Sequence, residues 1–287
     1  MPPDKQLHEE NRLSWNAATD AHNSHKRDQA RFFRAGGSTV FPEEIELLGD
    51  LEGKRLVHLQ CNAGQDSLSL VHLGAEVTGV DISDTAIEFA TRLSLESGIP
   101  ATFVRADVYD WLDTAAEQNE QFDIVFCSYG AICWLSDLNH WAERIESILK
   151  PSGRFVALEF HPFSYVFDEE WKLAYTYFAE GKAYTWDDGI HDYVKDSGET
   201  LTPSGYEDGI SDFVNPHRVH EFSWGIGEIV TALAKAGLRI EELHEYPFSN
   251  GAKLFTEMQE MTGNRMYPPA DYPSLPLMYG LLATRNP

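Results

Sequence analysis

The residue with the clearest chemical signature is Asp81, which follows an apolar run near the end of the segment 54–83. That segment shows, in order, an apolar strand, a loop of small residues, a helix and a second apolar strand that ends at Asp81. This order is typical of the first half of a nucleoside-binding βαβ unit. A carboxylate at this point accepts two hydrogen bonds from vicinal hydroxyls and repels a phosphate. Asp81 therefore predicts a ligand with a free ribose diol; the alternative is that it caps the next helix.

The loop between the first strand and its helix indicates which group lies beside that ribose. The loop carries a single glycine, Gly64, after Gln60 and Asn62, so it lacks the G-x-G-x-x-G pattern of a phosphate-binding loop. A pyrophosphate needs those glycines because the backbone must approach it closely. The loop instead suits a smaller zwitterionic group. Gln60 and Gln65 are candidates to bind its ammonium or carboxylate, or else they only stabilise the loop.

Three later predicted strands are also followed by residues that could take part in chemistry. These residues are Asp107-Val108, Ser128-Tyr129-Gly130 and Glu159-Phe160-His161-Pro162. A neutral imidazole at His161 could take a proton from an oxygen, nitrogen or sulfur nucleophile. The alternatives are a turn residue at Asp107, core packing at Tyr129 and a structural hydrogen bond at His161.

Alternating strands and helices must position these residues. The predicted strands are 55–59, 76–80, 102–105, 123–127, 154–160, 238–245 and 279–284, and the predicted helices are 6–21, 42–49, 65–73, 85–97, 138–149 and 226–236. The apolar run at 123–127 is typical of a strand buried on both faces. The alternation predicts an α/β fold, a Rossmann-like doubly wound sheet with helices on both faces.

The segment 161–224 interrupts this alternation and differs in composition. It holds 14 of the 35 aromatic residues, and 13 acidic residues against 4 lysines or arginines. Because it leaves the sheet at the carboxyl end of a strand, where α/β proteins bind ligands, we expect a lid over the substrate. The alternative is a cap that only shields the edge of the sheet. Candidate substrate-binding aromatics are Trp15, Phe33, Trp134, Tyr165 and Trp224.

Composition restricts the classes of partner. The formal net charge of −24 repels nucleic acid and anionic lipid, although such a charge can also serve solubility alone. Three cysteines are too few for a disulfide framework and suggest reduced thiols in a cytoplasmic protein. The first residues lack the features of a signal peptide, and no apolar run approaches the roughly 20 residues needed to cross a bilayer. We expect one domain over 1–287: a helical cover (1–50), a core (51–160), the lid (161–224) and a completing segment (225–287).

Five stretches together resemble the class I S-adenosylmethionine (SAM)-dependent methyltransferases. They are HLQCNAGQDSL, TGVDIS, RADVYD, FDIVFCSYGAICWLSDL and LKPSGRFV. More narrowly, the chain is similar to a bacterial group of small-molecule methyltransferases with a Gln-Cys-x-x-Gly-Gln-Asp first loop. The chain departs from the family pattern at Gln60 and Asn62, where glycine is usual, and at His58, where an acid is usual.

This resemblance implies a mostly parallel seven-stranded sheet whose last strand is antiparallel. It implies SAM as cofactor, S-adenosylhomocysteine as product, and no metal. The implied cofactor-binding residues are Gln60, Asn62, Gly64, Gln65, Asp81, Ile82, Asp107, Val108 and Ser128. Ile82 would lie against the adenine, and Asp107 would read its exocyclic amine. His161 and Tyr129 are the candidate catalytic residues.

The implied reaction is an in-line displacement that moves a methyl group to N, O or S of a small molecule. Catalysis would then come mainly from alignment of the reacting atoms. Two other functions stay open: a SAM-binding protein without methyl transfer, and a nicotinamide-dependent oxidoreductase, which the missing pyrophosphate glycines disfavour. The expected partner is a small acceptor, not nucleic acid or a membrane, and a homodimer is possible.

Overall fold

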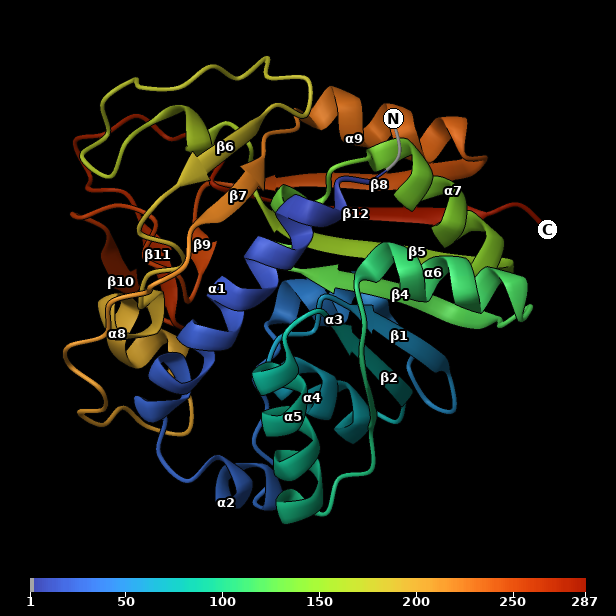
Figure 1. Ribbon diagram of the computed structural model, residues 1–287, viewed down its shortest axis with the longest axis horizontal. Helices are drawn as coiled ribbons and strands as arrows, with labels where there is room; N and C mark the ends of the chain where they lie inside the picture. The colour runs from blue at the N-terminus through green and yellow to red at the C-terminus, as the bar shows by residue number, and fades with distance from the viewer. Residues whose placement is uncertain (1–2) are drawn as a thin grey trace.

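A seven-stranded sheet forms the centre of the computed structural model, which describes residues 3–287 (Figure 1). Its strands are β1 (Arg55–Leu59), β2 (Glu76–Asp81), β3 (Thr102–Arg105), β4 (Phe122–Ser128), β5 (Leu149–Phe160), β8 (Leu238–Tyr246) and β12 (Met278–Arg285). Their order across the sheet is β3-β2-β1-β4-β5-β12-β8. Strands β1 to β5 pair in parallel, and β12 is antiparallel to both of its neighbours. The predicted Rossmann-like sheet with an antiparallel last strand is confirmed.

The strand order reverses between β1 and β4, which lie side by side in the middle of the sheet. In such sheets the chain leaves the two central strands in opposite directions, and a crevice opens beyond their carboxyl ends. Ile124 to Cys127 of β4 are fully buried, as the apolar run at 123–127 predicted. The rigid centre of the sheet therefore ends directly under the crevice.

Nine helices are assigned in the described part of the chain. They are α1 (Lys5–Ser24), α2 (Gln29–Arg34), α3 (Pro42–Leu48), α4 (Gln65–His72), α5 (Asp84–Ser97), α6 (Val108–Glu117), α7 (Leu138–Ile148), α8 (Tyr193–Ser197) and α9 (Ile226–Lys235). Leu112, Trp141 and Leu233 place α6, α7 and α9 in one core cluster with the sheet. Leu48 and Leu70 place α3 and α4 in another. The sheet is thus covered on both faces.

Helices α6 and α2 were not predicted from the sequence. In α6 the apolar residues recur at helical spacing, and Asp107 caps its first turn by accepting a hydrogen bond from Tyr109 N (2.9 Å). This capping signal was present in the sequence, but Asp107 was interpreted only as a ligand or a turn residue. The strand predicted at 154–160 also starts too late, because β5 already begins at Leu149; its pairing with β4 is irregular near that start.

The lid insertion contains regular structure that its sequence did not predict. Strands β6 (Ala183–Trp186) and β7 (Val219–Phe222) form an antiparallel pair. Three further short strands follow β8: β9 (Ser249–Asn250), β10 (Gln259–Met261) and β11 (Arg265–Tyr267). These elements gather with α8 at one end of the sheet, at the left in Figure 1. No helix among residues 3–287 combines the length and apolarity that crossing a bilayer would require.

Helix α1 runs beside the lid and is fastened to it by a reciprocal pair of hydrogen bonds. Asn11 Nδ2 donates to the carbonyl of His220 (2.8 Å), and His220 N donates to Asn11 Oδ1 (2.7 Å). The N-terminal helix and β7, far apart in sequence, therefore form one cover.

Gly64 provides a test of the packing beneath the first loop. Its φ is +78°, and an added Cβ would lie 2.7 Å from Ala90 Cβ and from Phe103 Cζ. We expect Gly64→Ala to lower the free energy of unfolding by about 2–4 kcal/mol, the sum of backbone strain and overpacking. Gly98 is a matched control, because its φ is +73° and nothing lies within 4 Å of an added Cβ. Gly98→Ala should cost only the backbone term, about 1–2 kcal/mol. Equal losses in urea unfolding would contradict the packing argument.

Candidate functional site

A cavity of about 880 Å³ lies at the carboxyl ends of the central strands, under α1 and the lid. It collects most of the predicted site residues: Trp15, Phe33, Gln60, Asn62, Gln65, Asp81, Ile82, Asp107, Val108, Ser128, Tyr129, Trp134 and Tyr165. Gly64, His161 and Trp224 are not among its described lining residues. A cavity of this size falls within the usual range for small-molecule and cofactor sites.

Asp81 holds together the two loops that border the ribose position predicted for it. Its Oδ2 accepts a hydrogen bond from Asn62 N (2.8 Å), and its Oδ1 accepts one from Ser83 N (2.8 Å). Burial raises the pKa of Asp81, and these backbone N–H groups oppose that shift. Each carboxylate oxygen can accept a second hydrogen bond, so the two hydroxyls of a diol could still be accommodated.

The first loop adopts the backbone conformation that glycine usually supplies, although it has other residues there. Gln60 (φ +54°) and Asn62 (φ +50°) both lie in the left-handed region. Asn tolerates this region better than most residues, whereas Gln does so at a cost. Gln60 Nε2 donates to the carbonyl of Ala131 (2.8 Å), which ties the loop to the chain after β4. Its Oε1 is buried and has no partner in the described residues. Gln60 therefore offers an unmet acceptor beside the cavity.

Gln65 joins the loop to the N-terminal helices. Its Nε2 donates to Asn23 Oδ1 (2.8 Å) and to Gln29 Oε1 (2.9 Å). These amides come from the end of α1 and the start of α2. Of the two roles that the sequence left open for Gln65, these contacts favour stabilising the loop.

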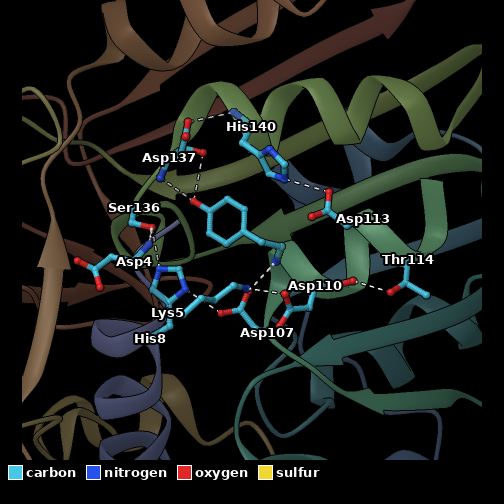
Figure 2. Close-up of polar contacts among 11 residues, drawn as sticks. Asp4, Lys5, His8, Asp107, Asp110, Asp113, Thr114, Ser136, Asp137 and His140 are labelled. Atoms are coloured by element: carbon cyan, nitrogen blue, oxygen red, sulfur yellow. Dashed lines mark hydrogen bonds and ion pairs between the residues drawn. The ribbon is translucent and has the colours of Figure 1, made fainter. Parts of the chain in front are cut away.

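Asp107 is already paired with α1, as Figure 2 shows. His8 Nδ1 donates to its Oδ2 (2.7 Å) and Lys5 Nζ to its Oδ1 (2.7 Å). Burial raises the pKa of Asp107, but the hydrogen bonds from His8 and Lys5 outweigh it and lower the pKa to about 2. His8 also stacks on Tyr109, with ring centroids 5.4 Å apart. Asp107, which was predicted to accept a hydrogen bond from the adenine amine, therefore also anchors α1.

Sequence reasoning missed Lys5 and His8. They are three residues apart, and a spacing of three on the predicted helix 6–21 and its preceding turn would place them on one face. That spacing was the available signal, but nothing in the sequence indicated that this face meets Asp107.

Tyr129, at the end of β4, belongs to a buried polar network. Its hydroxyl donates to Glu44 Oε2 (3.1 Å) and accepts a hydrogen bond from Asn250 Nδ2 (2.9 Å). Burial and the charge of Glu44 raise the pKa of Tyr129, so it is a neutral phenol. Ser128 Oγ lies 3.3 Å from His58 Nε2. Glu44 and Asn250 were missed because both are distant in sequence from the predicted motifs.

Glu159 fixes the loop that follows β4. Its carboxylate accepts hydrogen bonds from the backbone N–H groups of Gly130 (2.5 Å), Ala131 (2.6 Å) and Ile132 (2.9 Å). Burial raises the pKa of Glu159 to about 7, against the effect of these donors. Glu159 was noticed in the sequence only as a neighbour of His161.

His161 lies outside the cavity, with both ring nitrogens engaged. Nε2 lies 3.0 Å from Glu245 Oε1, and Nδ1 accepts a hydrogen bond from Phe163 N (3.0 Å). Burial lowers the pKa of His161, and the carboxylate of Glu245 opposes that shift. These contacts favour the alternative role for His161, a structural hydrogen bond, over proton transfer.

The predicted substrate aromatics do not share one environment. Trp15 and Trp134 meet edge to face at the main cavity, with ring centroids 5.6 Å apart. Trp224 instead lines a smaller adjoining cavity and donates from Nε1 to the carbonyl of Leu135 (2.7 Å). Phe33 is almost fully buried against Leu68 and its neighbours, so most of its ring packs in a core cluster.

The described residues 3–287 contain no group of three or more His, Cys, Asp or Glu side chains that could hold a metal ion.

The comparisons with known proteins agree with this geometry. Residues 57–153, from β1 into β5, match the family described as "Methyltransferase domain". The ubiquinone biosynthesis O-methyltransferase of Bordetella avium (strain 197N) is 32% identical over 124 residues, which cover 42% of this chain and 50% of that protein. The enzyme of the same name in Chelativorans sp. (strain BNC1) is 31% identical over 146 residues, covering 50% and 56%. The chain thus spans about half the length of these curated relatives.

A solved structure supports the fold over a longer stretch. The S-adenosylmethionine-dependent methyltransferase of Clostridium acetobutylicum ATCC 824 aligns with a TM-score of 0.55 at 12% identity, covering 90% of this chain and 96% of that one. At this identity the likeness shows the fold.

The paired state of Asp107 predicts a pH-dependent contribution to stability. Because its pKa is lowered from 3.8 to about 2, the charged form stabilises the fold above the unfolded pKa, and this is lost as the pH falls through 3.8 toward 2. We expect Asp107→Asn to lower the free energy of unfolding by roughly 1–2 kcal/mol at about pH 7 and by roughly half as much at about pH 3.

Asp110 is the matched control for this experiment. It also pairs with Lys5 (2.8 Å), but its side chain is 67% exposed. Asp110→Asn should change the free energy of unfolding by at most about 0.5 kcal/mol at either pH. If urea unfolding shows the same loss for both variants, the buried pairing with His8 is not the stabilising interaction.

Proposed function

We propose that this protein is a SAM-dependent methyltransferase that transfers a methyl group to N, O or S of a small molecule. The observation that carries the proposal is Asp81, which stands at the tip of β2 beside a first loop without pyrophosphate glycines, at the crevice between β1 and β4. The match of residues 57–153 and the named relatives support it.

The residues around the cavity fit the polar groups of SAM. Asp81 would receive the two ribose hydroxyls, with Ile82 against the adenine. Asp107 accepts hydrogen bonds from Lys5, Tyr109 and His8, which leaves room for about one more among the roughly four that a carboxylate can accept. One N–H of the exocyclic amine of adenine would take this remaining position on Asp107. The buried Oε1 of Gln60, which lacks a partner in the described residues, suits the ammonium of the methionine part.

Bound SAM supplies a methyl group that is already activated by its sulfonium. The chain's own contribution is to align the acceptor with that methyl and to exclude water, an effect worth up to about 7–11 kcal/mol. The lid and α1 close the cavity from above, which suits this role. The geometry of the loop after β4, fixed by Glu159, would set the position of the reacting atoms.

A proton must leave only if the acceptor arrives protonated. Tyr129 is the residue proposed to orient such an acceptor, because its hydroxyl stands at the cavity in contact with Glu44 and Asn250. His161 is assigned no step, since its two nitrogens face Glu245 and the backbone of Phe163. The domain limits, a cytoplasmic location, the exclusion of nucleic acid and a homodimer stay predictions.

Replacing Asp81 tests the proposal. An amide at this position presents an N–H₂ group to one hydroxyl of the ribose, so we expect Asp81→Asn to weaken S-adenosylhomocysteine binding at least tenfold in isothermal titration, about 1.4 kcal/mol. Glu76→Gln, on an exposed residue of the same strand, should bind as the wild type does. Wild-type affinity in the Asp81 variant would remove the ribose assignment, and a wild-type protein that binds neither SAM nor its product would overturn the proposed function.

A further inference from the structure

A second, smaller cavity adjoins the main one beneath the lid. It has a volume of about 140 Å³ and shares Cys133, Phe160, Tyr165, Trp186 and Glu221 with the main cavity's walls. We call it the side chamber. Its volume is between four and five times the ~30 Å³ that one water molecule occupies in the liquid, so it has room for a group of a few heavy atoms. The shared walls place such a group next to the main cavity.

Aromatic rings from the lid form much of the side chamber. They include Tyr175, Tyr184, Trp186 and Trp224. The ring plane of Tyr175 makes an angle of 88° with that of Trp186 (centroids 5.8 Å apart) and of 76° with that of Tyr184 (6.2 Å apart). The rings therefore meet nearly at right angles. The face of an aromatic ring carries partial negative charge, and several faces around one space attract a cation.

Two acidic side chains belong to the same space. Glu159 and Glu221 both line the side chamber, and no Lys, Arg or His is among its described lining residues. Glu221 accepts one hydrogen bond, from Trp186 Nε1 (2.8 Å), and its other carboxylate oxygen has no donor in the described part of the chain. Burial raises the pKa of Glu221, against the hydrogen bond from Trp186 and the nearby His191. An apolar site makes an unpaired carboxylate costly, and a cation would compensate for it.

A third observation also indicates a polar ligand. Tyr279 lines the side chamber, is 1% exposed, and its hydroxyl has no hydrogen-bond partner in residues 3–287. Buried polar groups in native proteins nearly always have a partner. The lone pairs of this hydroxyl are available to an N–H or O–H group that enters the chamber.

We infer that the side chamber binds the ammonium group of a cationic small molecule, and that the methyl acceptor is therefore an organic cation. This inference rests on the proposed function, because it names the substrate class of the same site. A neutral aromatic group would leave Glu221 unpaired. An anion would face two carboxylates. The two carboxylates among aromatic walls are too few to form a metal site.

The test uses choline as the cationic probe and 3,3-dimethylbutan-1-ol, its uncharged isostere, as the reference. With the full chain saturated with S-adenosylhomocysteine, we expect choline to bind at least tenfold more tightly than the isostere. Isothermal titration and tryptophan fluorescence would measure both affinities. Glu221→Gln should remove most of this preference while leaving the isostere and S-adenosylhomocysteine unaffected. Glu207→Gln, an exposed lid residue, should leave all three affinities unchanged.

A second variant covers the case in which Glu221→Gln does not fold. Tyr184 is only half-buried, and Tyr184→Leu keeps an apolar wall but removes one aromatic face. It should weaken choline about threefold and the isostere much less. If the protein binds S-adenosylhomocysteine but does not distinguish choline from its isostere, the inference is wrong and the proposed function survives. If it does not bind S-adenosylhomocysteine either, the proposed function fails as well.

Discussion

The hydrogen bonds that Asp81 accepts from Asn62 N and Ser83 N are the contacts on which the site's geometry depends. They join the loop after β1 to the loop after β2, two neighbouring strands whose parallel pairing already fixes the distance between them. The first loop can then keep left-handed backbone at Gln60 and Asn62 without glycine. Gln60 extends the connection to the chain after β4. Asp81 and Gln60 thus position three loops around a common space.

Polar contacts along the length of α1 attach the cover over this space. Asp107 fastens the start of α1, Gln65 fastens its end, and Asn11 joins its middle to the lid. Polar contacts of this kind are individually modest, because water can replace them. The sheet beneath is different, since its central strands are buried on both faces. The cavity therefore lies between a buried sheet and a cover that polar contacts hold.

The sequence predicted most of the sheet and the residues at its edge, because buried parallel strands have continuous apolar runs and because ligand residues follow such strands directly. It did not predict α6, since Asp107 carries a capping signal and a ligand signal at once. Glu44, Asn250 and His8 were beyond its reach, because their roles come from contacts between distant segments. His161 shows another limit: it begins a turn, with Ser164 N donating to its carbonyl (2.8 Å), and the turn directs its side chain away from the cavity.

The position of β12 has a consequence for how the protein is made. Residues 278–285 are translated after the rest of the sheet, yet they lie between β5 and β8. Until they leave the ribosome, those two strands have open edges that can pair with another chain. A nascent chain that stalls just before this strand would hence be prone to aggregate, and a chaperone would have reason to hold it until the final strand is added.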